Sequence, residues 1–388
     1  MHIVVPFGFY GAGNIGDEAT LHGFAKLIAE AGLRPQVSVA SRNPAHTALV
    51  EPAFRYHRAA GRDLRRWWAM LGASAHAIVG GTPIMDVLGN WPLNEVAPLV
   101  RSVDRWKVPL VFIGSGIETL RSDKSRRIVT NDIAPRVQHW TVRSDRDRQR
   151  LMECGVLRDR ITTAADLAWL IEPVSTGFGR ERLRAWGVDE GHPLIGVNLV
   201  NENGVFDRQP EMIDTLASAL DEICERMDAR VVFLANEVRE GPMFDKAAAM
   251  RVIGRMKSGD RATLTPNEYW SPRQMMSIIG CCSLTLSMRY HFCLFSALQT
   301  VPFIAVQRCD KVSDLCWDLD WPARVSPPDL HDTEIVEHGI RLMETSAVSE
   351  QLRKRAGRMR DRALLNIAAL DALASDQLVA SELFRSRP

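Results

Sequence analysis

Short apolar segments of strand length alternate with helical segments along almost the whole chain. In the first half the predicted strands are His2–Pro6, Gln36–Ala40, His76–Gly80, Pro109–Ile113 and Trp140–Val142. Parallel strands cannot be joined by tight turns, so each connection crosses the sheet, usually as a helix. The alternation therefore predicts an α/β protein whose parallel sheets are covered on both faces.

The alternation starts again halfway along the chain, after a turn-rich stretch from Glu172 to Gly177. A second set of strands is then expected at Leu194–Leu199, Arg230–Ala235, Leu284–Leu286 and Pro302–Val306. A length of 388 residues also fits two domains. We expect two Rossmann-like domains, residues 1–172 and 178–348, that face each other across a cleft. Residues 349–388 are expected to form a helical segment that packs back across both domains.

The charges nearly balance, with 48 Lys and Arg against 47 Asp and Glu. A protein that coats nucleic acid needs a basic excess to neutralise phosphates, so no nucleic-acid partner is expected. Any anion binding must depend on a local group of cations.

The seven cysteines are scattered and form no CxxC pair, which favours reduced thiols over a disulfide framework or a zinc site. The N-terminus has no signal-peptide pattern, and no apolar stretch is long enough to span a membrane. We expect a soluble cytoplasmic protein and leave open a peripheral contact with the inner face of the membrane. Nothing in the sequence sets the oligomeric state.

One segment bears on that membrane contact. Arg62, Arg65 and Arg66 adjoin Trp67 and Trp68, and a helix of this composition can rest on an anionic bilayer with its indoles among the headgroups. The alternative is a partly buried amphipathic helix with solvated arginines, which the sequence alone favours slightly.

The first predicted strand leads into a glycine-rich turn, Gly11 to Gly16, that formally satisfies GxGxxG. Two features argue against a dinucleotide. Asp17 and Glu18 begin the helix, where they compete with a pyrophosphate, and no acidic residue follows the second strand to hold a ribose. Arg42 after that strand leaves an NADP site as a weak alternative.

A better interpretation is a tight strand-to-helix turn formed by Gly13, Asn14, Gly16 and Asp17, in which Asn14 or Asp17 caps the helix or projects into the cleft. Two more glycine turns end predicted strands: Gly80 with Gly81, and Gly114 with Ser115 and Gly116. Ligands of open α/β sheets bind at this carboxyl edge, so these turns are candidate cleft residues.

The most informative segment lies in the second half, where Arg289 and His291 stand between a strand end and an apolar helix. Lys311 follows the next predicted strand, in a chain with 41 Arg and only seven Lys. Cations at neighbouring strand ends can converge on a small anion, and a histidine beside them can move a proton near neutral pH. This group is our candidate active site.

With these motifs the sequence resembles the polysaccharide pyruvyl transferase family. The matching pieces run in order over about four fifths of the chain: Gly13 to Ala19, Gly80-Gly81, Gly114 to Ile117, Val142 to Ser144 with Leu151 and Gly155, Asp166 to Ala168, Ser287 to His291, and Asp310 to Val312. The serine-x-arginine-x-histidine block with its downstream lysine is the most specific of them.

The resemblance implies a GT-B-like fold and phosphoenolpyruvate as a co-substrate, without a metal or any other cofactor. The acceptor would be a sugar of a polysaccharide or of a lipid-linked oligosaccharide, held by the first domain, and the product a pyruvate ketal. His291 would be the acid that protonates the donor. Arg143, Arg289 and Lys311, with Ser287, would hold the donor on the side of the second domain.

Two rival functions stay open from the sequence. One is a nucleotide-sugar-dependent glycosyltransferase of the same architecture. The other is a non-catalytic binding protein docked on a membrane through the Arg65–Trp68 helix.

Overall fold

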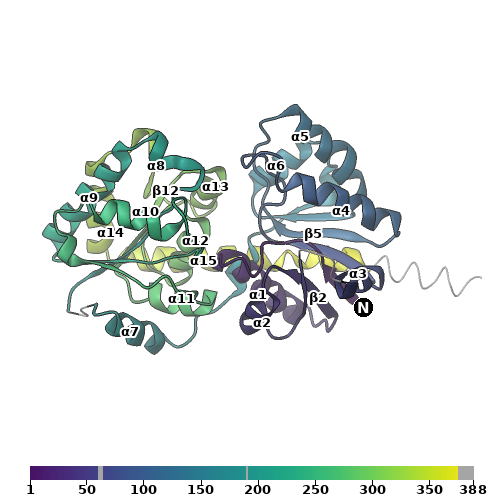
Figure 1. The fold of residues 1–388 in the computed structure, drawn as a ribbon, viewed down its shortest axis with the longest axis horizontal. Helices are drawn as coiled ribbons and strands as arrows, with labels where there is room; N and C mark the ends of the chain where they lie inside the picture. The colour runs from purple at the N-terminus through teal and green to yellow at the C-terminus, as the bar shows by residue number, and fades with distance from the viewer. Residues whose placement is uncertain (60–63, 189–190, 375–388) are drawn as a thin grey trace, which may run out of the picture. The chain divides into compact units, whose positions relative to one another are not determined.

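The computed structural model describes residues 1–59, 64–188 and 191–374. The chain forms two compact units, each built on one parallel sheet (Figure 1). The first unit comprises Met1–Ala12, Asp17–Ile171 and the chain from Arg360 onward, and the second comprises Gly13–Gly16 and Glu172–Met359. Each unit is described by itself.

The first sheet has the strand order β3-β2-β1-β4-β5-β6-β7, with every neighbouring pair parallel. Its strands are β1 (His2–Val5), β2 (Gln36–Ser41), β3 (Arg55–Arg58), β4 (Ala75–Val79), β5 (Leu110–Ser115), β6 (His139–Val142) and β7 (Ile161–Thr163). Successive strands β1, β2 and β3 extend the sheet in one direction, and β4 to β7 extend it in the other. The topological switch point therefore lies between β1 and β4.

The helices of this unit are α1 (Ile15–Glu30), α2 (Pro44–Val50), α3 (Leu64–Leu71), α4 (Leu93–Arg105), α5 (Asp123–Ile128) and α6 (Asp145–Glu153). Right-handed crossovers on the two sides of the reversal place helices on opposite faces, and Figure 1 shows α1 and α2 on one side of the strands and α4 on the other. The core between α4 and the sheet includes Phe112 and Trp140, whose ring centroids lie 4.1 Å apart.

The second sheet has the order β10-β9-β8-β11-β12-β13 and is also parallel throughout. Its strands are β8 (Leu194–Asn198), β9 (Arg230–Phe233), β10 (Ala262–Leu264), β11 (Leu284–Ser287), β12 (Phe303–Val306) and β13 (Arg324–Val325). The helices are α7 (Thr176–Ala185), α8 (Val205–Arg208), α9 (Glu211–Met227), α10 (Asp245–Ile253), α11 (Pro272–Ile279), α12 (Tyr290–Leu298), α13 (Asp310–Asp318), α14 (Asp332–Glu344) and α15 (Ala347–Leu364). The predicted α/β class with two Rossmann-like sheets is confirmed.

The C-terminal segment has buried residues in both units. Leu352 and Met359 of α15 are buried in the second unit, whereas Asn366 is buried in the first. The Asn366 amide donates to the Ala165 carbonyl at 2.9 Å, and the Arg362 guanidinium donates to the Ala164 carbonyl at 3.0 Å. Residues 367–374 are helical as well, and the predicted helical residues after 374 lie outside the described residues.

Candidate functional site

The second sheet has its topological switch point between β8 and β11. Loops after strands on both sides of this point carry charged residues: Glu202 after β8, Glu237 after β9, Arg289 after β11 and Arg308 after β12. Because all these strands are parallel, the four loops lie at the same carboxyl edge of the sheet.

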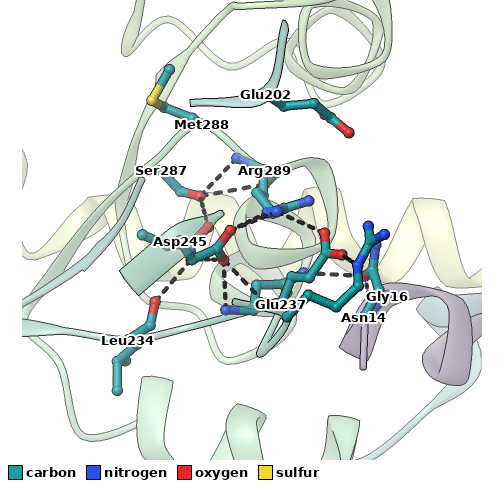
Figure 2. Close-up of polar contacts among 12 residues, drawn as sticks. Asn14, Gly16, Glu202, Leu234, Glu237, Asp245, Ser287, Met288 and Arg289 are labelled. Carbon is teal, nitrogen blue, oxygen red and sulfur yellow. Dashed lines mark hydrogen bonds and ion pairs between the residues drawn. The ribbon is translucent and has the colours of Figure 1, made fainter. Parts of the chain in front are cut away.

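Arg289, the residue before α12, binds two buried carboxylates (Figure 2). Its Nε and Nη2 donate to Asp245 Oδ1 at 3.0 and 2.5 Å, and Nη2 also donates to Glu237 Oε2 at 2.9 Å. Burial alone would lower the pKa of the guanidinium, but the two carboxylates outweigh burial and raise the pKa. Arg289 is therefore a fixed positive charge that joins β11 to the loops after β9.

The second oxygen of Asp245 holds the loop that follows β9. Oδ2 accepts from the Asn198 amide at 2.9 Å and from the backbone N–H groups of Asn236 and Glu237 at 2.9 and 3.1 Å. A buried carboxylate with this many donors is compensated for its loss of water. Asp245 thus fixes Glu237 in the position from which it meets Arg289.

Ser287 fixes the start of the same turn. Its Oγ accepts from the Arg289 backbone N–H at 3.0 Å and donates to Asn198 Oδ1 at 3.3 Å. The Ser287 side chain is buried, and its hydroxyl makes these hydrogen bonds inside the second unit.

The turn Gly13–Gly16 pairs with the loop after β9. Asn14 forms an isolated antiparallel bridge with Glu237, and the Gly13 carbonyl accepts from the Val238 N–H at 3.0 Å. Asn14 Oδ1 accepts from the Gly16 N–H at 2.9 Å, which supplies a partner to one of the first amides of α1.

His291 lies directly against this turn. A Cβ added to Gly16 would stand 2.0 Å from His291 Nδ1, far inside van der Waals contact. Gly16 is therefore the residue that makes room for the imidazole. The ring also lies near Phe295 of α12, with centroids 6.2 Å apart.

Three cations act on one carboxylate beside the same edge. Arg308 Nη2 donates to Glu202 Oε2 at 2.6 Å, and Arg308 Nε donates to the Met288 carbonyl at 3.0 Å. Burial works to raise the pKa of Glu202, but Arg308, Lys311 and Arg289 outweigh it and lower that pKa to about 2. Arg308, Lys311 and Arg289 thus gather near Glu202 within one unit, where Glu202, Glu237 and Asp245 balance their charge.

Arg143, the third predicted cation, belongs to the first unit and follows β6. Its guanidinium lies 3.3 Å from Asp166 and donates to Thr82 Oγ1 at 3.3 Å. Gly116 allows this arrangement, because a Cβ there would stand 1.5 Å from Arg143 Nη2. Whether Arg143 acts together with the cations of the second unit stays a prediction.

The glycine turns of the first unit accommodate close packing. Gly80, Gly81 and Gly114 have φ of 61°, 63° and 60°, values that favour glycine. A Cβ at Gly80 would stand 2.6 Å from Thr20 of α1, whose hydroxyl donates to the Asp17 carbonyl at 2.8 Å.

The glycine-rich loop after β1 already binds a carboxylate of the chain itself. Glu18 Oε1 accepts from the Gly11 N–H at 2.5 Å, and burial raises the pKa of Glu18 to about 7. A pyrophosphate on that amide would have to displace a buried side chain, which argues against the NADP alternative.

A family model described as "Polysaccharide pyruvyl transferase" matches residues 14–310, a span that includes the Gly13–Gly16 turn almost completely, Arg143, His291 and Arg308. The chain belongs to the polysaccharide pyruvyl transferase family. No curated protein matches it.

Solved structures with the same fold include proteins in complex with nucleotide sugars. Anabaena Alr3699/HepE in complex with UDP-glucose has a TM-score of 0.64 at 12% identity, covering 96% of this chain and 99% of that one. The UDP-GlcNAc 2-epimerase of Neisseria meningitidis bound to UDP-GlcNAc has a TM-score of 0.60 at 10% identity, covering 95% of this chain and 99% of that one. The UDP-N-acetylglucosamine 2-epimerase of Rickettsia bellii has a TM-score of 0.59 at 12% identity, covering 97% of this chain and 95% of that one. Identities this low show only that this pyruvyl transferase family member has the predicted GT-B-like fold.

Sequence reasoning missed four charged residues of the second unit: Glu202, Glu237, Asp245 and Arg308. Arg308 follows β12 as Lys311 does, so its place at a strand end could have identified it. Glu202 and Glu237 also follow strands, β8 and β9, so the same signal applies to them. Asp245 carries no such signal, because it begins α10 and its role depends on contacts with distant segments. Across residues 1–59, 64–188 and 191–374, no group of His, Cys, Asp and Glu is arranged to hold a metal ion.

Proposed function

We propose that the protein transfers the pyruvyl group of phosphoenolpyruvate to a sugar and forms a cyclic ketal. The observation that carries this proposal is the position of His291: it lies beside a turn that only glycine permits, on the helix that begins after Arg289. The same sheet edge holds the three cations Arg289, Arg308 and Lys311. A proton donor next to cations suits an anionic enol substrate.

In the proposed reaction His291 protonates the methylene carbon of phosphoenolpyruvate, which becomes a methyl group. The adjacent carbon gains oxocarbenium character and forms bonds to two sugar hydroxyls, while its bond to the phosphate oxygen breaks. Of the two hydroxyl protons, one restores His291 and the other leaves with phosphate. No electron transfer is needed.

The cations have different roles in this proposal. Lys311 and Arg308 are the partners of the donor's phosphate and carboxylate, and a bound donor competes with Glu202 for them. Arg289, whose Nε and Nη2 are occupied by carboxylates, positions the turn that carries His291. Arg143 is the cation contributed by the first unit.

The acceptor is a sugar of a surface polysaccharide or its lipid-linked precursor, made in the cytoplasm. Family membership supports the polysaccharide, and the GT-B-like fold is common to enzymes of activated sugars. Among the described residues, no helix has the length and apolar character needed to cross a membrane.

The direct test measures phosphate release from phosphoenolpyruvate with and without added glycan acceptors. We expect release that depends on the acceptor in the wild type and a loss of at least about a hundredfold in His291→Ala. His192→Ala is the matched control. His192 precedes β8, at the edge of the sheet opposite the candidate site, and hydrogen-bonds the Asp228 carbonyl at 3.0 Å. Wild-type turnover in His291→Ala would rule out the acid assignment.

Thermal shifts separate this proposal from a glycosyltransferase. Phosphoenolpyruvate is expected to stabilise the protein, and Lys311→Gln to reduce that stabilisation. Stabilisation by UDP-sugars with no response to phosphoenolpyruvate would overturn the proposed donor.

A further inference from the structure

Helix α3 of the first unit exposes four large apolar side chains. Leu64, Trp67, Trp68 and Leu71 are 71%, 48%, 73% and 52% exposed. Their spacing of three and four residues places them along one face of the helix. Monomeric proteins rarely leave adjacent tryptophans and leucines in water without a partner.

The opposite face of α3 is anchored in the unit. Met70 is buried, and the Arg66 guanidinium donates to the Ala59 carbonyl and to the Pro6 carbonyl. The helix is therefore packed through Arg66 and Met70, and its apolar face is directed outward as a consequence of that packing. The helix is partly buried and Arg65 is exposed, as the sequence favours, but Trp68 lies on the exposed face and Trp67 is only half-buried.

Exposed cations lie on α3 and on elements that contact it. Arg65 lies on α3, and Arg55 and Arg58 lie on the neighbouring edge strand β3; all three side chains are exposed. The ring of Trp67 also lies 6.3 Å from that of Trp106, which stands between the exposed Arg105 and Lys107 in sequence.

Of the acidic residues near these cations, Asp63 precedes α3 in the sequence and lies outside the described residues. Asp104 is the nearest one along the chain to Trp106, and its carboxylate lies 3.3 Å from Arg136. Arg62 of the predicted basic segment lies outside the described residues. An apolar helix face with nearby basic side chains is complementary to an anionic lipid bilayer, which has negative headgroups above an apolar interior.

We propose that α3 docks the protein on an anionic phospholipid bilayer, with Trp67 and Trp68 at the level of the headgroups. Indole rings favour that interface because it accepts an apolar ring and a polar N–H together. Exposed arginines add electrostatic attraction to anionic lipids. This inference rests on the surface of α3 and not on the proposed pyruvyl transfer.

The test is co-sedimentation of the full chain with phosphatidylcholine vesicles that contain or lack phosphatidylglycerol. We expect binding only to the anionic vesicles, weakened by salt, and at least about tenfold weaker for Trp67→Ser/Trp68→Ser. Arg65→Glu should lower the affinity by about fivefold or more. Trp317→Ser is the matched control, because Trp317 is 53% exposed in the second unit.

The outcomes are distinguishable. Absence of wild-type binding at low salt, or an equal loss in Trp317→Ser, overturns the proposal. So does a dimer in light scattering that the double variant dissociates without any vesicle binding. Phosphate release with a water-soluble acceptor should be unchanged in the double variant, and vesicle binding unchanged in His291→Ala, so each proposal can fail without the other.

Discussion

The absence of a side chain at Gly16 leaves room for the imidazole of His291, the proposed acid, and this contact can be tested. Gly16 lies in the first turn of α1, where alanine is favoured over glycine by helix propensity, but its Cβ would collide with the imidazole. We expect Gly16→Ala to change the free energy of unfolding by less than about 1 kcal/mol. The displaced imidazole should lower kcat by at least about tenfold.

Steady-state kinetics and thermal unfolding of the same preparation check this expectation. Gly357→Ala is the control, because Gly357 lies in α15 with open space around its missing side chain. Wild-type kcat in Gly16→Ala would show that the position of the ring is not important for the reaction.

Arg289 offers a second test, which separates positioning from donor binding. Arg289→Gln leaves Asp245 and Glu237 buried without their cation, so we expect a loss of about 3–5 kcal/mol of stability. Adding Asp245→Asn should recover part of that loss, which denaturant unfolding of the single and double variants measures.

The kinetic readout depends on the role of Arg289. A positioning residue lowers kcat when it is replaced, whereas Lys311→Gln should mainly raise the KM for phosphoenolpyruvate. If Arg289→Gln in the Asp245→Asn background raised only that KM, Arg289 would be a direct donor ligand and not a positioning residue.

The central strand β4 carries a histidine with no exposed surface. The His76 ring is buried, and burial lowers its pKa to about 4 although a contact with the Met70 backbone opposes the shift. The unfolded chain binds a proton near pH 6.5 and the folded protein does not, so stability falls as the pH drops from about 6.5 to 4. The shift corresponds to about 3 kcal/mol.

We expect His76→Leu to remove this part of the acid sensitivity. The comparison is the free energy of unfolding of the two proteins between pH 7.5 and 4.5, measured in denaturant. Parallel pH curves for wild type and variant would show that His76 does not titrate across this range.

Strand prediction succeeded where the residues are buried on both faces and failed at the sheet edges. The central strands β1, β4, β5 and β8 are largely apolar, and the sequence predicts them within two residues at each end. The edge strand β3 reads Arg-Tyr-His-Arg, and β13 has only two residues, so neither produces an apolar pattern. Edge strands need not be apolar, because water covers one side.

The candidate site was predictable only in part, for a related reason. His291, Arg289 and Lys311 follow strands whose apolar character marks them, and the order of the strand ends places them at one edge. The contact of Gly16 with His291 joins positions 275 residues apart by their numbers, and no periodic pattern encodes it. The same holds for the pairing of Arg289 with Glu237.

Stability of the first unit depends on residues from the far end of the chain. The Asn366 amide donates to the Ala165 carbonyl, and the Thr141 hydroxyl donates to Asn366 Oδ1, a contact between residues 225 positions apart. Asn366→Ala would remove the acceptor of the Thr141 hydroxyl and the donor to the Ala165 carbonyl, and we expect a loss of about 2–3 kcal/mol of stability.

Hydrogen exchange can locate that loss within the molecule. Peptides from β6 and from residues 164–170 should exchange faster in Asn366→Ala, because their buried groups lose partners in the first unit. Peptides from β11 in the second unit should keep their protection in Asn366→Ala. Arg353→Ala is the control, because the Arg353 side chain is exposed on α15, and all these peptides should keep their protection in it. Equal acceleration in β6 and β11 would mean that the two units unfold together, and that the contribution of Asn366 extends to the whole chain.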